Sequence, residues 1–288
     1  MAESSRSGLI FGGFAPFALI LAAIFQYFGA GLAVQLFDEL AIGTVAWGRI
    51  AASAILLMLI VRPRIRKMSF LNILIFGLTL TGMNLSFYYS IAYLPLGAAV
   101  SIEFLGPVLL SVFSSSGIRP RIALLLAFTG VLLISWVGFD LSDSKVQYGL
   151  LMSAIAGGLW AFYIWLGNRA VQQGSGPETL ATGMMIGAIV FLPFALPELP
   201  QVATNWYFIL LLFLVGFFAS VLPYIIEFSV LRYVPTWMFS LLMALYPAAS
   251  LGIGVVMLGQ IPTFGEVSGL ICITAAVVLI SEKTKDAV

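Results

Sequence analysis

Apolar residues run through this chain in long blocks that are separated only by short polar stretches. A block of about 20 residues, folded as an α-helix, crosses a hydrocarbon core of roughly 30 Å. Membrane β-strands would instead show about ten residues of strict alternation, and these blocks are apolar on every face. The pattern predicts an all-α integral membrane protein with ten transmembrane helices, at residues 10–35, 42–61, 70–92, 96–116, 121–139, 147–168, 179–196, 206–230, 235–258 and 263–281.

The composition agrees with a membrane protein and narrows the chemistry. Hydrophobic residues make up 61% of the chain, charged residues make up 9%, and the mean hydropathy is +1.11, far from soluble domains. The sequence has no phosphate-binding GxxxxGK[ST] motif, which argues against direct use of ATP. It contains no histidine and a single cysteine, Cys272, so histidine relays, most transition-metal sites and an internal disulfide are excluded. We therefore expect no cofactor and no metal.

The charges between the blocks predict an orientation. With the N-terminus in the cytoplasm, eleven Lys and Arg residues fall on the cytoplasmic side and only Lys145 falls outside. The outer loops instead carry acids such as Asp38, Glu39, Asp140 and Glu198. Because cytoplasmic loops are enriched in Lys and Arg, we expect a multi-pass protein of the bacterial inner membrane with both termini in the cytoplasm.

The two halves of the chain resemble each other. The stretch YLPLGAAVSIEFLGP at 93–107 returns as YVPTWMFSLLMALYP at 233–247, with the tyrosine and both prolines in register. We predict a first five-helix repeat at 1–143 and a second at 144–288. Because each repeat has an odd number of spans, the second copy enters the membrane from the opposite side. Loops that carry Lys or Arg in one copy accordingly correspond to loops without a cation in the other. Inverted repeats are typical of secondary transporters that alternate access to a site near the midplane.

Two ionisable residues lie deep inside predicted spans. Arg49 and Glu103 are seven and eight residues from the outer ends of the second and fourth spans, or about 10 to 12 Å. A charge at that depth is costly unless it is paired or faces water. One interpretation is a structural ion pair, and the other is a lining of a substrate cavity or gate. We expect a partly hydrated pair at the border of the cavity.

Glu227 and three prolines form a second group of candidates. Glu227 lies near the cytoplasmic end of the eighth span, where it either snorkels towards the headgroups or serves as an inner-gate acid beside Arg232. Pro107 and Pro247 interrupt the helical hydrogen bonds of mirror-related spans, and Pro223 precedes Glu227 by one turn. All three prolines are predicted helix hinges.

Aromatic and neutral polar residues complete the candidates. Aromatic residues on the third, sixth and eighth spans are usually packing or interface residues. The alternative is that they line a cavity for substrates with varied side chains. The further candidates for a substrate cavity or gate are Asn84, Tyr88, Trp160, Tyr163, Tyr224, Ser240 and Tyr246.

Three stretches resemble the EamA-type, ten-helix members of the drug/metabolite transporter superfamily: LPLGAAVSIEFLGPVLLS at 94–111, LPYIIEFSVLRYVPTWMFSLLMALYPA at 222–248, and the arginine of WGRIAASAILL at 47–57. They are most similar to bacterial amino-acid exporters of the homoserine/threonine type, and the aromatic amino-acid exporters are more distant. That resemblance implies an acid before Pro247 and another after the LG pair, where this chain has Tyr246 and Gln260.

The resemblance implies a secondary active transporter that exports small metabolites, most often amino acids, by alternating access. The alternatives are a passive channel, or a carrier of another class such as nucleotide sugars or lipid-linked molecules. An intramembrane enzyme is disfavoured because Ser–His chemistry lacks its histidine, and Glu103 and Glu227 are expected at opposite depths. The expected partners are a small-molecule substrate and the lipid bilayer, with no nucleic acid. A monomer is favoured over a homodimer packed through GEVSG at 265–269.

Overall fold

The computed structural model describes residues 2–64, 69–113, 118–138, 140–172, 176–231 and 246–283. Within these ranges all regular secondary structure is helical, which confirms the predicted fold class. Five stretches are long and apolar enough to cross a membrane: Phe17–Leu36, Ile42–Val61, Phe70–Ile91, Ser144–Gly167 and Trp206–Glu227. Shorter apolar helices occupy Leu96–Pro107, Arg121–Gly130, Tyr246–Leu258 and Phe264–Ala276. The number of ten spans therefore stays a prediction.

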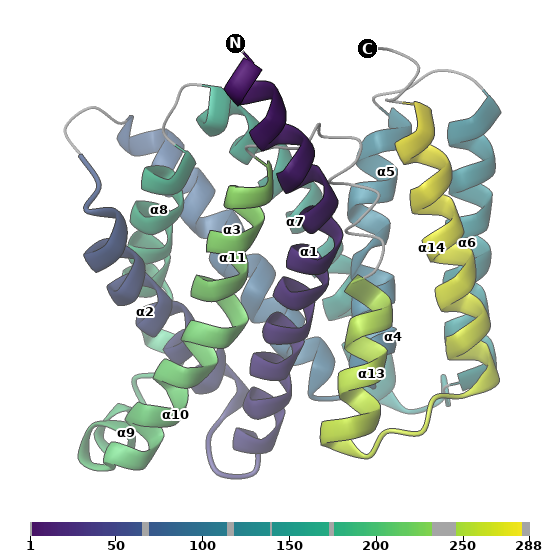
Figure 1. Cartoon of the computed structure of the whole chain (residues 1–288). Helices are drawn as coiled ribbons and strands as arrows, with labels where there is room; N and C mark the ends of the chain where they lie inside the picture. The colour runs from purple at the N-terminus through teal and green to yellow at the C-terminus, as the bar shows by residue number, and fades with distance from the viewer. Residues whose placement is uncertain are drawn as a thin grey trace.

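The first three helices are α1 (Ala2–Leu36), α2 (Ile42–Val61) and α3 (Phe70–Ile91). Helices α2 and α3 follow the predicted bounds closely, whereas α1 begins eight residues before the predicted start at residue 10. The three helices run alternately up and down the bundle (Figure 1). Their long apolar stretches allow the hydropathy pattern to locate them.

The fourth predicted span is divided into two helices. They are α4 (Leu96–Glu103) and α5 (Leu105–Phe113). Pro107 has no N–H to donate to the carbonyl of Glu103, four residues earlier, so the helical ladder is interrupted there. Gly106 lies so close to Gly157 that an added Cβ would overlap the Gly157 carbonyl oxygen. The break is thus pressed against α7 (Ser144–Gln172).

The seventh predicted span is shorter than expected. After α6 (Ile118–Gly138) and α7, helix α8 runs from Gly176 to Val190 instead of to residue 196. Pro193 and Pro197 follow, and proline cannot continue a helical ladder. A 3₁₀ turn, η2 (Leu192–Phe194), and a short helix, α9 (Leu199–Thr204), fill the remaining chain. These two elements lie at the end of the bundle opposite the start of α1 (Figure 1).

The eighth predicted span contains a change of helix type. It consists of α10 (Trp206–Gly216), a π-helical turn η3 (Phe217–Val221) and α11 (Leu222–Leu231). In η3 the N–H of Leu222 donates to the carbonyl of Phe217. Such π-turns leave neighbouring carbonyl groups without a partner inside the helix, and they are frequent at functional sites.

The last two described helices are α13 (Tyr246–Leu258) and α14 (Phe264–Lys283). Helix α14 packs along α6 (Figure 1). A Cβ on Gly130 of α6 would lie 2.7 Å from the carbonyl oxygen of Gly269, the last glycine of GEVSG. Gly269 of this motif thus serves close packing of two helices within the chain. A capping box, in which Glu266 accepts from the N–H of Thr263 at 2.7 Å, starts α14.

The remaining helices pair across the bundle. Helix α1 packs on α10, η3, α11 and α13; α7 packs on α3, α4 and α5. Helix α2 packs on α8, and α4 packs on α13. Two clusters of buried apolar side chains fill these contacts, one around Tyr27, Tyr88 and Tyr246 and the other around Phe76 and Met184. Several predicted site residues belong to these clusters or pack against them, among them Tyr88, Tyr246 and Tyr224.

Candidate functional site

Arg49 projects from α2 and is bound to the π-helical turn. Its Nε–H donates to the hydroxyl of Ser220 at 3.0 Å, and its Nη2–H donates to the carbonyl of Ala219 at 2.7 Å. The side chain is buried, and its guanidinium carbon lies 5.2 Å from the centre of the Tyr88 ring. A buried guanidinium needs such partners, because desolvation of a charge is expensive.

The carbonyl of Ala219 is available to Arg49 because of Pro223. In a regular helix the N–H of residue 223 would donate to the carbonyl of residue 219, and proline has no N–H. Ser53 of α2 contacts the neighbouring part of the same segment, since its hydroxyl lies 3.1 Å from the carbonyl oxygen of Gly216 and 2.7 Å from that of Arg49 in its own helix. Pro223, predicted as a hinge, therefore lies at an irregular turn whose carbonyls are bound by residues of α2.

Glu103 ends α4 at the break before Pro107. The residue is 9% exposed, and no residue in the described ranges donates a hydrogen bond to its carboxylate. Its backbone carbonyl, which Pro107 leaves without a helical donor, contacts α7 so closely that a Cβ on Gly157 would lie 2.6 Å from it. Glu103 is thus held rigidly by its backbone while its side chain stays free to bind.

A direct ion pair between Arg49 and Glu103 is not formed. Arg49 binds Ser220 and Ala219 instead. The positive charge of Arg49 nevertheless lies close enough to act on the Glu103 carboxylate. Helices α2 and α4, which carry the two residues, begin at the same end of the bundle (Figure 1). The structure thus shows no direct ion pair, and the partly hydrated pair that we expected stays a prediction.

Glu227 does not lie in isolation near the end of its helix. Its Oε1 accepts a hydrogen bond from the Tyr246 hydroxyl at 2.7 Å. The ring of Tyr246 in turn packs edge-on against Tyr27, with the centroids 6.1 Å apart. Tyr246 occupies the position where the resemblance implied an acid. This chain therefore has at that position a hydrogen-bond donor to Glu227 of α11.

Tyr27 and Tyr224 connect these charged groups. Each of the two lies within electrostatic range of Arg49, Glu103 and Glu227. We call the residues around these two tyrosines the polar centre: Tyr27, Arg49, Tyr88, Glu103, Tyr224, Glu227 and Tyr246. Both acids act on the same two tyrosines, and their relative depth in the membrane stays a prediction.

Three further candidates surround the polar centre. Asn84 donates to the carbonyl of Leu80 at 2.7 Å and lies beside the Tyr224 side chain. Trp160 packs edge-on against Phe104, with centroids 4.6 Å apart. Tyr163 packs on Phe76 and lies within range of Tyr224. Their described contacts are packing contacts and local hydrogen bonds.

Some predictions fall on other parts of the chain. Ser240 and Arg232 lie outside the described residues. Pro247 is the second residue of α13, so its role as a hinge depends on the preceding residues and stays a prediction. Among the residues in the described ranges, no group of three or more His, Cys, Asp or Glu side chains is placed to hold a metal ion.

Sequence reasoning missed two features of the site. Tyr27 follows Gln26 in a predicted first span that has no charged residue, so the fold is needed to reveal its position. The π-helical turn and its partner Ser220 were also missed, although Pro223 was a signal of irregular hydrogen bonding at residue 219. The capping box of Thr263 and Glu266 had a readable pattern, TFGE, and is structural.

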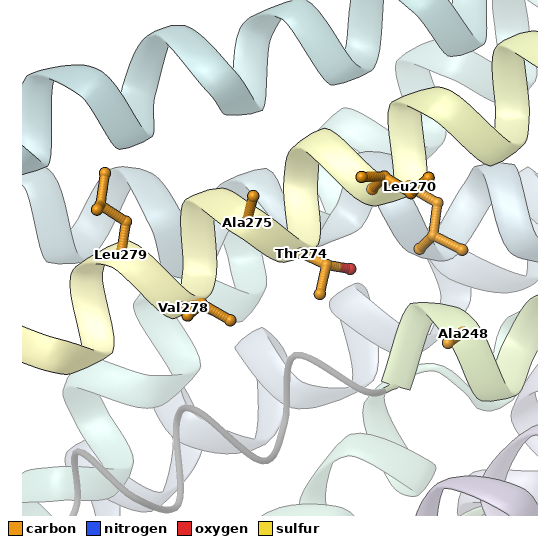
Figure 2. Close-up of a pocket in the computed structure, with 7 residues that line it drawn as sticks. Ala248, Leu270, Thr274, Ala275, Val278 and Leu279 are labelled. Atoms are coloured by element: carbon orange, nitrogen blue, oxygen red, sulfur yellow. The ribbon is translucent and has the colours of Figure 1, made fainter.

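An open groove of about 490 Å³ lies away from the polar centre, along α14 beside α13 (Figure 2). Ala248, Leu270, Ala275 and Leu279 line it with aliphatic surface, and Thr274 adds one hydroxyl. None of the predicted site residues contributes to it. A charged metabolite would find no ionic partner among these side chains, so the groove is not the candidate site.

The polar centre brings together groups of both signs of charge. It combines one fixed cation, one acid without a donor in the described ranges and one acid bound by a tyrosine. Ionisable residues inside a membrane bundle commonly mark substrate or ion pathways. The apolar helices and this interior site together define a multi-pass membrane protein of the transport type.

Comparison with known proteins identifies the family. Residues 147–282 match the EamA-like transporter family. The threonine/homoserine exporter RhtA of Salmonella typhimurium strain SL1344 is 35% identical over 251 residues, covering 86% of this chain and 84% of the relative. RhtA of Escherichia coli strain K12 is 33% identical over 265 residues, covering 91% and 89%. This chain therefore belongs to the EamA-like transporter family.

One solved structure shares the fold. It bears only the description "Crystal structure of protein", and it matches with a TM-score of 0.63 at 16% sequence identity. The match covers 95% of this chain and 97% of that chain. The arrangement of helices described above is thus found in a second molecule over nearly its whole length.

Proposed function

We propose that this protein is a secondary transporter that exports small neutral amino acids of the threonine and homoserine kind across the inner membrane. It does so by alternating access to the polar centre, between two inverted five-helix repeats at 1–143 and 144–288. It acts as a carrier and not as an enzyme. The observation that carries this proposal is the similarity to the RhtA exporters over more than four fifths of both chains.

The pairing of helices supports the inverted repeats. If α1 corresponds to α7 and α3 corresponds to α10–α11, then the packing of α1 on α11 mirrors the packing of α7 on α3. The packing of α1 on α13 likewise mirrors that of α7 on α4 and α5. The pairs α2–α8, α4–α13 and α6–α14 map onto themselves under this exchange. A two-fold relation between the halves accounts for this pattern. The odd number of spans predicted for each half favours an axis in the membrane plane, as in transporters with inverted repeats.

The positions of the helix ends support the proposed orientation. Helix α1 begins and α14 ends at the same end of the bundle, where the loop with Arg62 and Arg64 also lies (Figure 1). In a Cys272→Ser background, a cysteine at Asp143 should react with an impermeant maleimide added to intact cells. A cysteine at Arg64 should react only after the membrane is opened. The reverse labelling would contradict cytoplasmic termini.

Counterflow in proteoliposomes tests the function. Vesicles loaded with unlabelled threonine should take up labelled threonine transiently above equilibrium, and homoserine should replace threonine on either side. A passive channel equilibrates the label without this overshoot. Overshoot with nucleotide sugars or lipid-linked molecules alone would assign the protein to another class of carrier, and flux equal to that of protein-free vesicles for all solutes would reject transport.

A further inference from the structure

Glu103 presents a buried carboxylate that no residue in the described ranges binds. The residue is 9% exposed, and the positive charge of Arg49 reaches it only across a separation. An unpaired carboxylate in a low-dielectric interior is costly, and the cost is removed when a cation or a hydrogen-bond donor binds it. The break at Pro107 fixes the backbone of Glu103 against Gly157, so the carboxylate has a defined position.

Arg49 presents the complementary group. A guanidinium has five N–H donors, and Ser220 and Ala219 occupy only two of them, so further donors remain for Tyr88 and for a ligand. The hydroxyl of Tyr88 is fully buried beside the guanidinium and has no well-formed hydrogen bond within the described residues. These donors suit a carboxylate, which prefers planar N–H groups of arginine and hydroxyl donors.

The lack of a direct ion pair between Arg49 and Glu103 matters for ligand binding. If Arg49 paired directly with Glu103, neither group would be left to bind a ligand. Arg49 is instead held on the π-helical turn, at a distance over which its charge still acts on Glu103. A molecule with an ammonium group at one end and a carboxylate at the other satisfies both residues at once.

We infer that the polar centre binds the backbone groups of an α-amino acid zwitterion. Glu103 accepts the α-ammonium group, and Arg49 with Tyr88 binds the α-carboxylate. This inference rests on the proposed function and assigns the ends of its substrate. It predicts that recognition depends on the two charged ends, and that compounds lacking either end bind weakly whatever their side chain.

Binding to the purified protein tests this inference separately from transport. Ligand affinity is obtained from the rise in melting temperature with L-threonine, N-acetyl-L-threonine, which lacks the ammonium group, and L-threonine methyl ester, which lacks the carboxylate. For the wild-type protein we expect both analogues to bind at least about tenfold more weakly than threonine. Equal affinity for threonine and either analogue would overturn the inference.

The variants assign each end. Glu103→Gln should bind threonine about tenfold more weakly or worse, and its preference for threonine over the N-acetyl compound should fall to about twofold. Tyr88→Phe should weaken threonine about threefold to tenfold while leaving the methyl ester unchanged. Arg49→Lys should lose most of the preference for threonine over the ester, because an ammonium group lacks the planar fork.

Glu39→Gln provides the matched control, because Glu39 is an exposed acid outside the polar centre. This variant should bind all three compounds as the wild type does. If the wild type transports threonine but Glu103→Gln keeps the wild-type preference for it, the inference fails and the proposed function stands. If the wild type neither binds nor transports amino acids, the proposed function itself fails.

Discussion

Two breaks in the helices, one at Glu103–Pro107 and one at Ala219–Pro223, use the same chemistry with different results. In each, a proline removes the donor for the carbonyl four residues earlier. At the second break that carbonyl accepts a hydrogen bond from Arg49 at 2.7 Å. At the first, the carbonyl of Glu103 is packed against Gly157, and the adjacent carboxylate has no donor among the described residues.

The difference separates a structural charge from an available one. Arg49 stabilises the π-helical turn and joins α2 to α10–α11, so its removal should weaken the fold. The carboxylate of Glu103 has no hydrogen-bond donor within the described ranges, so its removal should affect function more than stability. A site for a zwitterion needs a cation and an acid that do not pair with each other, because a direct ion pair would leave neither group for the ligand.

The largest effect should come from the packed break. Gly106→Ala places a methyl group on the Gly157 carbonyl oxygen, and backbone atoms cannot move away as a flexible side chain can. We expect a loss of about 3 kcal/mol or more in stability, or no folded protein. Gly158→Ala is the control, because no neighbouring atom lies within 4 Å of a Cβ there. Melting temperatures in one detergent compare the two variants, and equal values would show that the break is not tightly packed.

A smaller effect should couple Arg49 to Pro223. Arg49→Gln should cost about 2 to 3 kcal/mol, because two charge-assisted hydrogen bonds are weakened. Pro223→Ala returns an N–H that can donate to the Ala219 carbonyl. In that background the loss of Arg49 should therefore cost about 1 kcal/mol less. A double-mutant cycle of unfolding free energies measures the coupling, and strictly additive losses would mean that the proline does not create the binding site for Arg49.

The smallest effect should come from Tyr246→Phe. This variant removes the donor to Glu227 at 2.7 Å and keeps the ring contact with Tyr27. Hydrogen bonds between membrane helices contribute modestly, so we expect a loss of about 1 kcal/mol. Tyr207→Phe serves as the control, because Tyr207 is 51% exposed. Unfolding free energies of Tyr246→Phe and Tyr207→Phe test this prediction. Equal values would show that the hydrogen bond to Glu227 contributes nothing to stability.

Most of the helical framework could be predicted because it depends on hydropathy and length. Helices α2 and α3 begin and end within a residue of the predicted bounds. The errors occurred where proline acts: the fourth span is divided, the seventh ends at Val190 and the eighth contains a π-helical turn. Hydropathy reports whether a segment is apolar, and it does not report whether its hydrogen bonds follow one helical pattern.

The candidate site could be predicted residue by residue, but its contacts could not. Charges inside apolar spans are rare and costly, which made Arg49, Glu103 and Glu227 visible in the sequence. Their partners depend on tertiary packing: Arg49 binds a backbone carbonyl, and Glu227 binds Tyr246 from α13. Tyr27 joins the polar centre from a predicted span without a charged residue, so the fold reveals its position.

The central claim is that Arg49 is bound into the fold while Glu103 is reserved for substrate. Unfolding free energy and threonine counterflow, measured together for Arg49→Gln and Glu103→Gln, test it most directly. We predict that Arg49→Gln loses both stability and transport, whereas Glu103→Gln keeps at least wild-type stability and loses transport. A Glu103→Gln protein that is destabilised as much as Arg49→Gln, or that transports threonine at the wild-type rate, would contradict the claim.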